Sequence, residues 1–460
     1  MDGGTSFFSD LLGSIAERGR AMLDIGRERR AAGAAKAAGL VELCERLLSG
    51  RGEASGVALA REILVTYQGL KTGERIAFFE ALARTFGPDG PRLERAIAAY
   101  GAGASPRALA ELHAASEPRR QELIRRFNLA PGATALLVKM RADLLDALAR
   151  RPDLAEVDRD FVHLFASWFN RGFLVLRRID WSTPANVLEK IIRYEAVHEI
   201  RDWNDLRARV DSPDRRCYAF FHPALVDEPL IFVEVALTKD APDAIAPILA
   251  EKRTPLDPAL AKTAVFYSIS NTQRGLGGVT FGNFLIKQVV EEISREFPKL
   301  TDFVTLSPVP GFRGWLEGER RNPASVVLTD EDRTALEALD TPGVPDEAAR
   351  KALAPVIAAL GAHYFLIART SKGRPIDPVA RFHLGNGARL ERINPFGDLS
   401  DRGMTQAFGL MVNYRYVLAD IEKNHEAFFD KAEIVASPAV RKLLRAETPQ
   451  RALAVREASL

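Results

Sequence analysis

The chain has 460 residues, 47% hydrophobic and 27% charged, the balance of a globular protein with enough core for two or three domains. Its 63 basic and 61 acidic residues leave a net charge of +2, which gives no basis for nucleic-acid or membrane binding. Only two cysteines are present, Cys44 and Cys217, so we expect no disulfide framework and a reducing compartment, the cytoplasm.

The first 160 residues predict one helix after another, because apolar residues recur there at intervals of three and four. Ser105-Pro106 is typical of an N-cap followed by proline at the first helical position. We predict an all-α helical bundle domain over residues 1–160, with helices covering Leu40–Leu48, Val57–Val65, Ile76–Phe86, Leu93–Tyr100, Ala108–Leu112, Leu123–Leu129 and Ala135–Leu148.

The residue composition changes after this region. Phe161–Leu176 is rich in aromatic residues and predicts a buried segment, and Thr183-Pro184 predicts the start of a helix over Ala185–Tyr194. The E-x-x-H spacing of Glu195–His198 recurs at Glu422–His425, as in di-iron proteins, but nothing marks the two further helices that such a site needs. We therefore expect no metal site.

Strands are predicted next along the chain. Cys217–His222 and Leu230–Leu237 flank a polar segment and predict a β-hairpin, and Thr263–Ser270 predicts a third strand. The three runs are apolar, β-branched and aromatic, which favours a sheet.

A glycine-rich turn over Gln273–Gly278 then separates this third strand from an amphipathic run, Val279–Phe297, and a further strand, Phe303–Leu306, ends at Ser307. Free N–H groups at the start of a helix form an anion site, usually for phosphate. The spacing is neither G-x-G-x-x-G nor G-x-x-x-x-G-K-[ST], so the alternative is a plain tight turn.

The last third of the chain predicts both helices and strands. Periodicity predicts a helix at Ala348–Leu360 and a final helix at Thr405–Glu426 that carries Tyr414 and Tyr416. Tyr364–Ala368 and Ala380–Ile393, the latter with a turn at Gly385–Gly387, are predicted to close the sheet.

Several segments together resemble a bacterial-type malonyl-CoA decarboxylase, a family whose catalytic domain is a variant of the GNAT acetyltransferase fold. They lie in the family's order over the last 300 residues or so: Ser167–Phe173, Ser268–Ser270, Gln273–Val279, Phe284–Lys287, Leu306–Phe312, Phe382–Leu384 with Asn386–Ala388, and Asn413–Tyr416. The resemblance implies an α+β fold, with a GNAT-like domain over 161–460 built on a splayed, mostly antiparallel mixed sheet flanked by helices.

The resemblance also implies site residues. Ser307 would orient the malonyl carboxylate, and His383 would donate a proton to the enolate, since a pKa near 6.5 makes both protonation states reachable. Further substrate- and CoA-binding candidates are Ser268, Gln273, Gly277, Gly278, Val279, Thr280, Asn283 and Tyr416. Thr280 stands where some animal members carry a glutamate, which leaves no carboxylate acid at that position.

The resemblance also implies partners, and it leaves alternatives open. Malonyl-CoA would be the substrate, with no metal or organic cofactor because the thioester is the electron sink, and residues 1–160 would hold a homotetramer. An ordinary GNAT acyltransferase and a non-catalytic CoA-ester sensor remain as alternatives. A covalent acyl-serine is not expected, because the chain lacks a G-x-S-x-G elbow.

Overall fold

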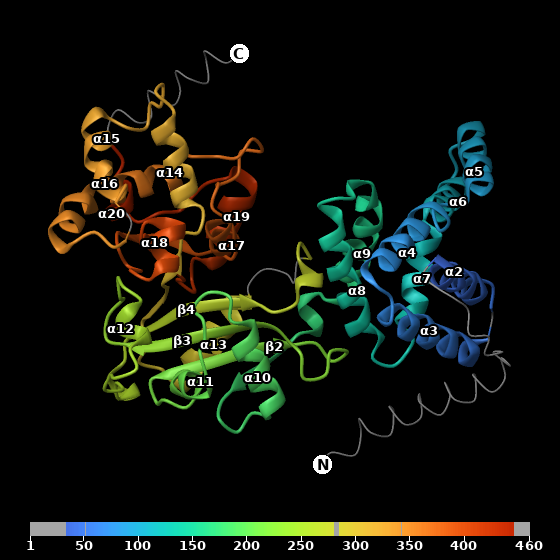
Figure 1. Cartoon of the computed structure of the whole chain (residues 1–460), viewed down its shortest axis with the longest axis horizontal. Helices are drawn as coiled ribbons and strands as arrows, with labels where there is room; N and C mark the ends of the chain where they lie inside the picture. Colours follow the sequence, from blue (N-terminus) through green and yellow to red (C-terminus); the bar gives the residue numbers. More distant parts are fainter. Residues whose placement is uncertain (1–33, 51, 280–284, 342, 446–460) are drawn as a thin grey trace. The chain divides into compact units, whose positions relative to one another are not determined.

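The chain folds into two compact units (Figure 1). A computed structural model describes residues 34–50, 52–279, 285–341 and 343–445. Of the described residues, the helical unit holds those up to Leu174 together with His222–Val226 and Gln273–Val279. The sheet unit holds Val175–Phe221, Asp227–Thr272 and the described residues from Leu285 onward.

The helical unit contains the helices that apolar periodicity predicts. Ser105 caps one of them by accepting a hydrogen bond from the Ala108 N–H, and Pro106 is its first residue, as predicted. No helix in the described ranges has the length and apolarity needed to cross a membrane. The helices are α2 (Ala34–Ser49), α3 (Glu53–Gln68), α4 (Thr72–Arg84), α5 (Gly90–Ala102), α6 (Pro106–Ser116), α7 (Arg119–Phe127), α8 (Ala133–Leu148) and α9 (Ala155–Trp168).

The predicted burial of the aromatic segment is only half correct. Phe161 and Phe165 are fully buried on α9, but Phe173 and Val175 are 53% and 43% exposed. The helix ends at Trp168, and the chain continues into β1, an edge strand with one open side. Phe173 lies in a 3₁₀ turn before this strand, and of the strand itself only Ile179 is buried, which the aromatic composition of the segment did not reveal.

The sheet unit is built on a mixed sheet of eight described strands, in the order β1-β2-β3-β4-β5-β8-β6, with β7 also paired to β8. Among the described strand pairs, β4 and β5 alone are parallel. The hairpin and third strand are confirmed. The strands are β1 (Val175–Ile179), β2 (Arg215–Phe221), β3 (Pro229–Thr238), β4 (Thr263–Asn271), β5 (Asp302–Thr305), β6 (Ser307–Pro308), β7 (Arg389–Asn394) and β8 (Met411–Arg415).

Helices cover both faces of this sheet, which confirms the predicted α+β class. Helix α10 (Ala185–Tyr194) and α11 (Trp203–Val210) pack on the face that carries Cys217, and α12 (Ala246–Leu249) packs on the same face farther along. Helix α13 (Leu285–Glu296) reaches the other face, where its Glu296 pairs with Arg216 at 2.6 Å.

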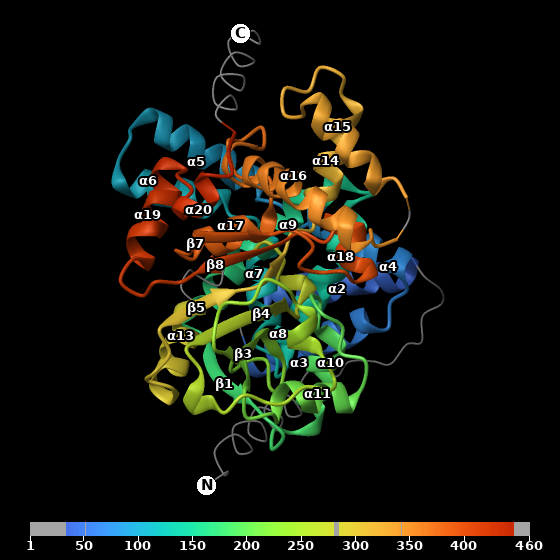
Figure 2. The same cartoon turned by 90° about the vertical axis from the view of Figure 1, so that its left-hand side faces the viewer.

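The last third differs most from the prediction. Tyr364–Ala368 is not a strand, because α16 (Glu347–Leu366) extends into it and ends at Leu366. Ala380–Ile393 is a helix followed by a strand: α17 (Pro378–Gly385) begins at Pro378, where Asp377 caps it by accepting from the Ala380 N–H at 2.7 Å. Figure 2 shows β7 and β8 beneath α16 and α17.

The predicted final helix is also wrong. Helix α18 (Asp401–Ala407) ends where Phe408 and Gly409 both take positive φ angles, and the chain then forms β8. Tyr414 therefore lies on a strand and Tyr416 follows it, before α19 (Ile421–Lys431) begins. The remaining helices are α14 (Phe312–Arg321), α15 (Asp330–Leu336) and α20 (Pro438–Arg441).

Candidate active site

Two neighbouring strands diverge in the middle of the sheet. The parallel pairing of β4 with β5 ends at Phe266 and Thr305, after which β4 continues to Asn271. Ser307 on β6 pairs instead with Val412 of β8, so it bends away from β4. Side chains, rather than ladder hydrogen bonds, must line the space that this splay opens.

A pocket of about 240 Å³ occupies the splay. Four segments line it: β4, β6, α17, and the turn that follows α10. Its walls are largely apolar, with a few polar groups converging on it, as is usual for small-molecule sites. We call it the acyl pocket, and its lining residues are Val197, Phe266, Tyr267, Ile269, Asn271, Ser307, Pro308, Pro378, Val379, Phe382 and His383.

A series of hydrogen bonds ends at this pocket. The Ser307 hydroxyl donates to Thr305 Oγ1 at 2.9 Å and lies 3.2 Å from His383 Nε2. The Tyr416 hydroxyl lies 2.8 Å from His383 Nδ1. With Ser307 donating to Thr305, its oxygen accepts from Nε2–H, and Nδ1 then accepts from the Tyr416 hydroxyl. The ring therefore carries its proton on the nitrogen that faces the serine.

The imidazole of His383 is held in an apolar environment. The residue is 3% exposed, and its ring stacks on Tyr414 with centroids 4.6 Å apart. Burial lowers the pKa of His383 to about 3, because the imidazolium would lose its hydration. The expectation that both protonation states are reachable near neutral pH is therefore wrong for the ligand-free pocket, in which the ring is neutral. Burial also keeps Tyr416 a phenol by raising its pKa.

Ser268 is not brought to the acyl pocket. Its neighbours Tyr267 and Ile269 line the pocket, but the Ser268 hydroxyl lies 2.8 Å from both carboxylate oxygens of Glu195. Side chains alternate between the two faces of a strand, so Ser268 lies on the opposite face from Ile269.

The glycine loop packs within the helical unit, with a 3₁₀ turn at Arg274–Leu276 against α8. A side chain at Gly275 would clash, because its Cβ would lie 1.8 Å from the Val138 carbonyl oxygen. Arg141 donates to the Gly275 carbonyl at 2.8 Å. This glycine is thus required for close packing.

The other loop candidates have mixed outcomes. The N–H groups of Gly277 and Val279 bond to carbonyls of the loop itself, at 2.9 and 3.0 Å, and Gly278 has a φ of 75°. Gln273 begins the 3₁₀ turn as its N-cap. Thr280 and Asn283 lie outside the described residues.

The two E-x-x-H segments make hydrogen bonds within the protein. Glu195 accepts from the His198 N–H at 2.7 Å, and His425 Nδ1 lies 2.7 Å from the Gly385 carbonyl oxygen. Within the described residues, no group of three or more His, Cys, Asp and Glu side chains could hold a metal ion.

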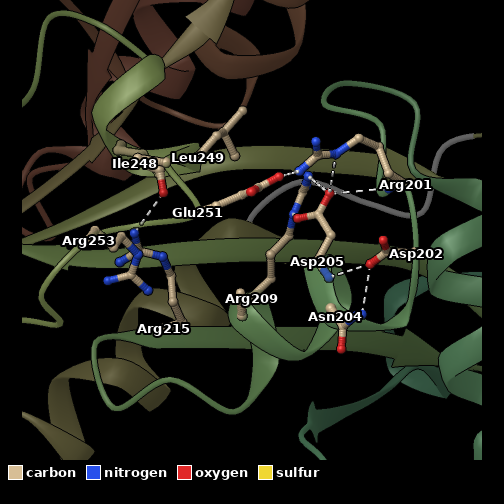
Figure 3. A pocket seen from close by; sticks show the side chains of 12 residues that line it. Arg201, Asp202, Asn204, Asp205, Arg209, Arg215, Ile248, Leu249, Glu251 and Arg253 are labelled. Atoms are coloured by element: carbon tan, nitrogen blue, oxygen red, sulfur yellow. Dashed lines mark hydrogen bonds and ion pairs between the residues drawn. The ribbon is translucent and has the colours of Figure 1, made fainter.

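A second pocket of the sheet unit, about 300 Å³, lies between α11 and α12 and is rich in arginine (Figure 3). Its charges are already compensated, so it offers no cation to a free anion. Arg201 pairs with Glu251, Arg209 with Asp205 and Glu234, and Arg253 with Asp214, while Arg215 contacts Asp214 and donates to the Ile248 carbonyl.

Comparison with known proteins decides the family. The malonyl-CoA decarboxylase C-terminal domain matches residues 172–454, and the malonyl-CoA decarboxylase N-terminal domain matches residues 86–169. The mitochondrial malonyl-CoA decarboxylase of Anser anser anser is 38% identical over 413 residues, covering 82% of this chain and 82% of the relative. The chain belongs to the malonyl-CoA decarboxylase family.

Crystal structures of malonyl-CoA decarboxylases extend the likeness to the fold. That from Rhodopseudomonas palustris is 63% identical with a TM-score of 0.86, covering 88% of this chain and 99% of its own. That from Agrobacterium vitis is 55% identical with a TM-score of 0.85, covering 88% and 100%. The family resemblance found in the sequence is confirmed.

The family motifs did not predict two contacts of the site. Thr305 lies two residues before Ser307, a spacing that places both hydroxyls on one side of an extended chain. Tyr414 lies two residues before Tyr416, but its placement in a predicted helix hid its stacking on His383. The period-two pattern was the usable signal in both cases.

Proposed function

We propose that this chain is a carboxy-lyase that converts malonyl-CoA into acetyl-CoA and CO2 in the acyl pocket. The observation that carries the proposal is the Ser307–His383–Tyr416 hydrogen-bond series at that pocket, in a chain of the malonyl-CoA decarboxylase family. The thioester carbonyl accepts the electron pair that leaves with the C–C bond, so the scheme uses no metal or organic cofactor.

Ser307 orients the departing carboxylate in this scheme. Its hydroxyl is buried at the start of β6 and donates to Thr305 when no ligand is bound, and the same O–H can turn to donate to a carboxylate oxygen in the pocket. Apolar walls such as Phe266 and Phe382 keep bulk water from the carboxylate, and loss of hydration favours its conversion to neutral CO2.

His383 supplies the proton that the enolate carbon takes up. The neutral ring presents Nε2–H toward Ser307, while Tyr416 holds Nδ1 and fixes that tautomer. A thioester enolate is a stronger base than the imidazolate that remains, so a neutral N–H can protonate the carbon, and the ring then regains its proton from water.

CoA binding is proposed for the loop that begins at Gln273 and for the chain that follows it. The backbone of Gly277, Gly278 and Val279 is proposed to meet the phosphates, since Gly278 has open space where a side chain would lie and a helix start attracts phosphate. On the basis of the family motif, Thr280 and Asn283 are also proposed to bind CoA. Ser268 does not contact the substrate in this proposal and supports β4 from its other face.

A homotetramer held by the helical unit is proposed in addition. Large apolar side chains on its helices and in the turn after α7 are more than half exposed, which suits an interface between copies. They are Val65, Ile97, Leu109 and Leu129. We also propose the cytoplasm as the location, supported by two buried, unpaired cysteines.

Release of CO2 without an acceptor tests the proposed function. Purified protein is given malonyl-CoA labelled with carbon-13 in the free carboxylate and no amine, and labelled CO2 and acetyl-CoA are followed together. Equal amounts of both are expected. CO2 release only after an amine is added would favour an acyltransferase, and binding without product would favour a CoA-ester sensor.

A further inference from the structure

The acyl pocket has one wall that belongs to neither the sheet nor α17. Strands β4 and β6 are fixed by ladder hydrogen bonds, and α17 carries His383. The fourth wall is the turn that follows α10, residues 195–198, and Val197 is its lining residue. A change in this turn can alter the pocket without touching Ser307 or His383.

One carboxylate fixes the turn. Oε1 of Glu195 accepts from the backbone N–H groups of Val197 and His198, both at 2.7 Å. The same carboxylate lies 2.8 Å from the Ser268 hydroxyl and 3.3 Å from that of Ser270 on β4. Glu195 therefore ties the turn to β4, another wall of the pocket.

Two further contacts complete the attachment. The Ala196 N–H donates to Ser270 Oγ at 3.1 Å, and Arg402 Nη1 donates to the Val197 carbonyl at 3.2 Å. Both serines are 1% exposed, so the carboxylate bonds are sheltered from water and stronger than surface ones. The E-x-x-H segment thus has a structural role beside the pocket.

We infer that Glu195 is a positioning residue that holds Val197 as the wall limiting the size of the acyl group, so that malonyl is accepted and an α-methyl branch, as in methylmalonyl, is disfavoured. This inference rests on the proposed function. Sterically, a methyl group added against a packed wall forces neighbours apart. One methyl group in a rigid apolar pocket typically changes selectivity by roughly 10–200-fold, so a single wall residue can determine it.

Substitution of the wall tests the inference directly. Val197→Ala should raise kcat/KM for methylmalonyl-CoA relative to malonyl-CoA roughly tenfold, at the low end of that range. Val187→Ala is the matched control, because Val187 is buried on α10 and does not line the pocket. It should lower the melting temperature and leave the ratio unchanged. An unchanged ratio in Val197→Ala would overturn the inference.

The same ratio of kcat/KM values tests the role of Glu195. Glu195→Ala should shift it in the direction of Val197→Ala, and the double variant should add nothing, because both act through one wall. Glu195→Gln should be intermediate, since its carbonyl oxygen can still accept from the Val197 and His198 N–H groups. A purely structural role predicts lower melting temperatures in both Glu195 variants with no change in selectivity, which would overturn the inference.

A binding measurement tests this inference independently of the proposed function. Calorimetry gives the dissociation constants of acetyl-CoA and propionyl-CoA, which differ by the same methyl group and need no decarboxylation. Val197→Ala should improve propionyl-CoA binding relative to acetyl-CoA, whether or not CO2 is released. Equal affinity ratios in the substituted and unsubstituted proteins would contradict the inference even if decarboxylation is confirmed.

Discussion

Some polar side chains of the acyl pocket could be predicted from the sequence, and others could not. Family motifs identified Ser307, His383 and Tyr416, and the structure brings these three together. The same motifs identified Ser268, which the structure assigns to Glu195 on the other face of β4. The pKa of His383 could not be predicted, because it depends on burial by segments far apart in the chain.

Ser307→Ala should slow decarboxylation roughly ten- to a hundred-fold. A hydrogen bond to a buried charge contributes roughly 1–3 kcal/mol, and the substitution removes one such bond to the carboxylate. Initial rates of CO2 release measure the loss, and intact mass spectrometry of enzyme quenched during turnover checks for covalent intermediates. A malonyl or acetyl group found on Ser307 would contradict the orienting role.

The pH profile of kcat/KM reports the state of His383 in the free enzyme. With its pKa lowered to about 3, the ring is neutral between about pH 5 and pH 8. An acid of ordinary pKa would lose its proton as pH rises through 6.5, and the rate would fall. We expect no such fall near pH 6.5. A tenfold decrease per pH unit above 6.5 would show that the imidazolium is the acid.

At the scale of elements, prediction succeeded where one periodicity runs uninterrupted and failed where short elements alternate. The helical unit and the β2–β3 hairpin followed their patterns. The helix α17 was taken for a strand, although Asp377-Pro378 repeats the cap-and-proline pattern of Ser105-Pro106. Strand β8 was hidden in a helical pattern that the positive φ angles of Phe408 and Gly409 interrupt.

Gly277→Val should weaken binding of CoA and malonyl-CoA alike, because a branched side chain would cover the backbone proposed to meet the phosphates. Its φ is compatible with a side chain, whereas Gly278 has a φ of 75° and a substitution there would strain the fold. Calorimetric titration with CoA measures the effect. Gly275→Ala is the control for packing and should lower the melting temperature. Unchanged CoA affinity in Gly277→Val would place the phosphates elsewhere.

At the scale of the whole molecule, chain order did not reveal which distant segments associate. The glycine loop follows a strand of the sheet unit, yet it groups with α8 of the helical unit. Long-range packing of this kind has no periodic signature. The division of the chain at residue 160 and the tetramer stay predictions.

Light scattering coupled to size exclusion tests the assembly. We expect a particle of about four times the 50.6 kDa chain. Ile97→Glu with Leu109→Glu should shift it toward smaller species, because charges would be buried between copies. Leu260→Glu is the control, an exposed position in the sheet unit. A monomer of the unsubstituted protein at micromolar concentration would contradict the predicted assembly.

The turnover of His383→Asn is the measurement that tests the account most directly. The substitution removes the proton donor and leaves the glycine loop untouched, so CO2 and acetyl-CoA formation should fall roughly 100-fold or more while CoA affinity is retained. The melting temperature of the variant controls for folding. Turnover close to that of the unsubstituted protein, with CoA still bound, would remove His383 from the reaction and contradict the mechanism.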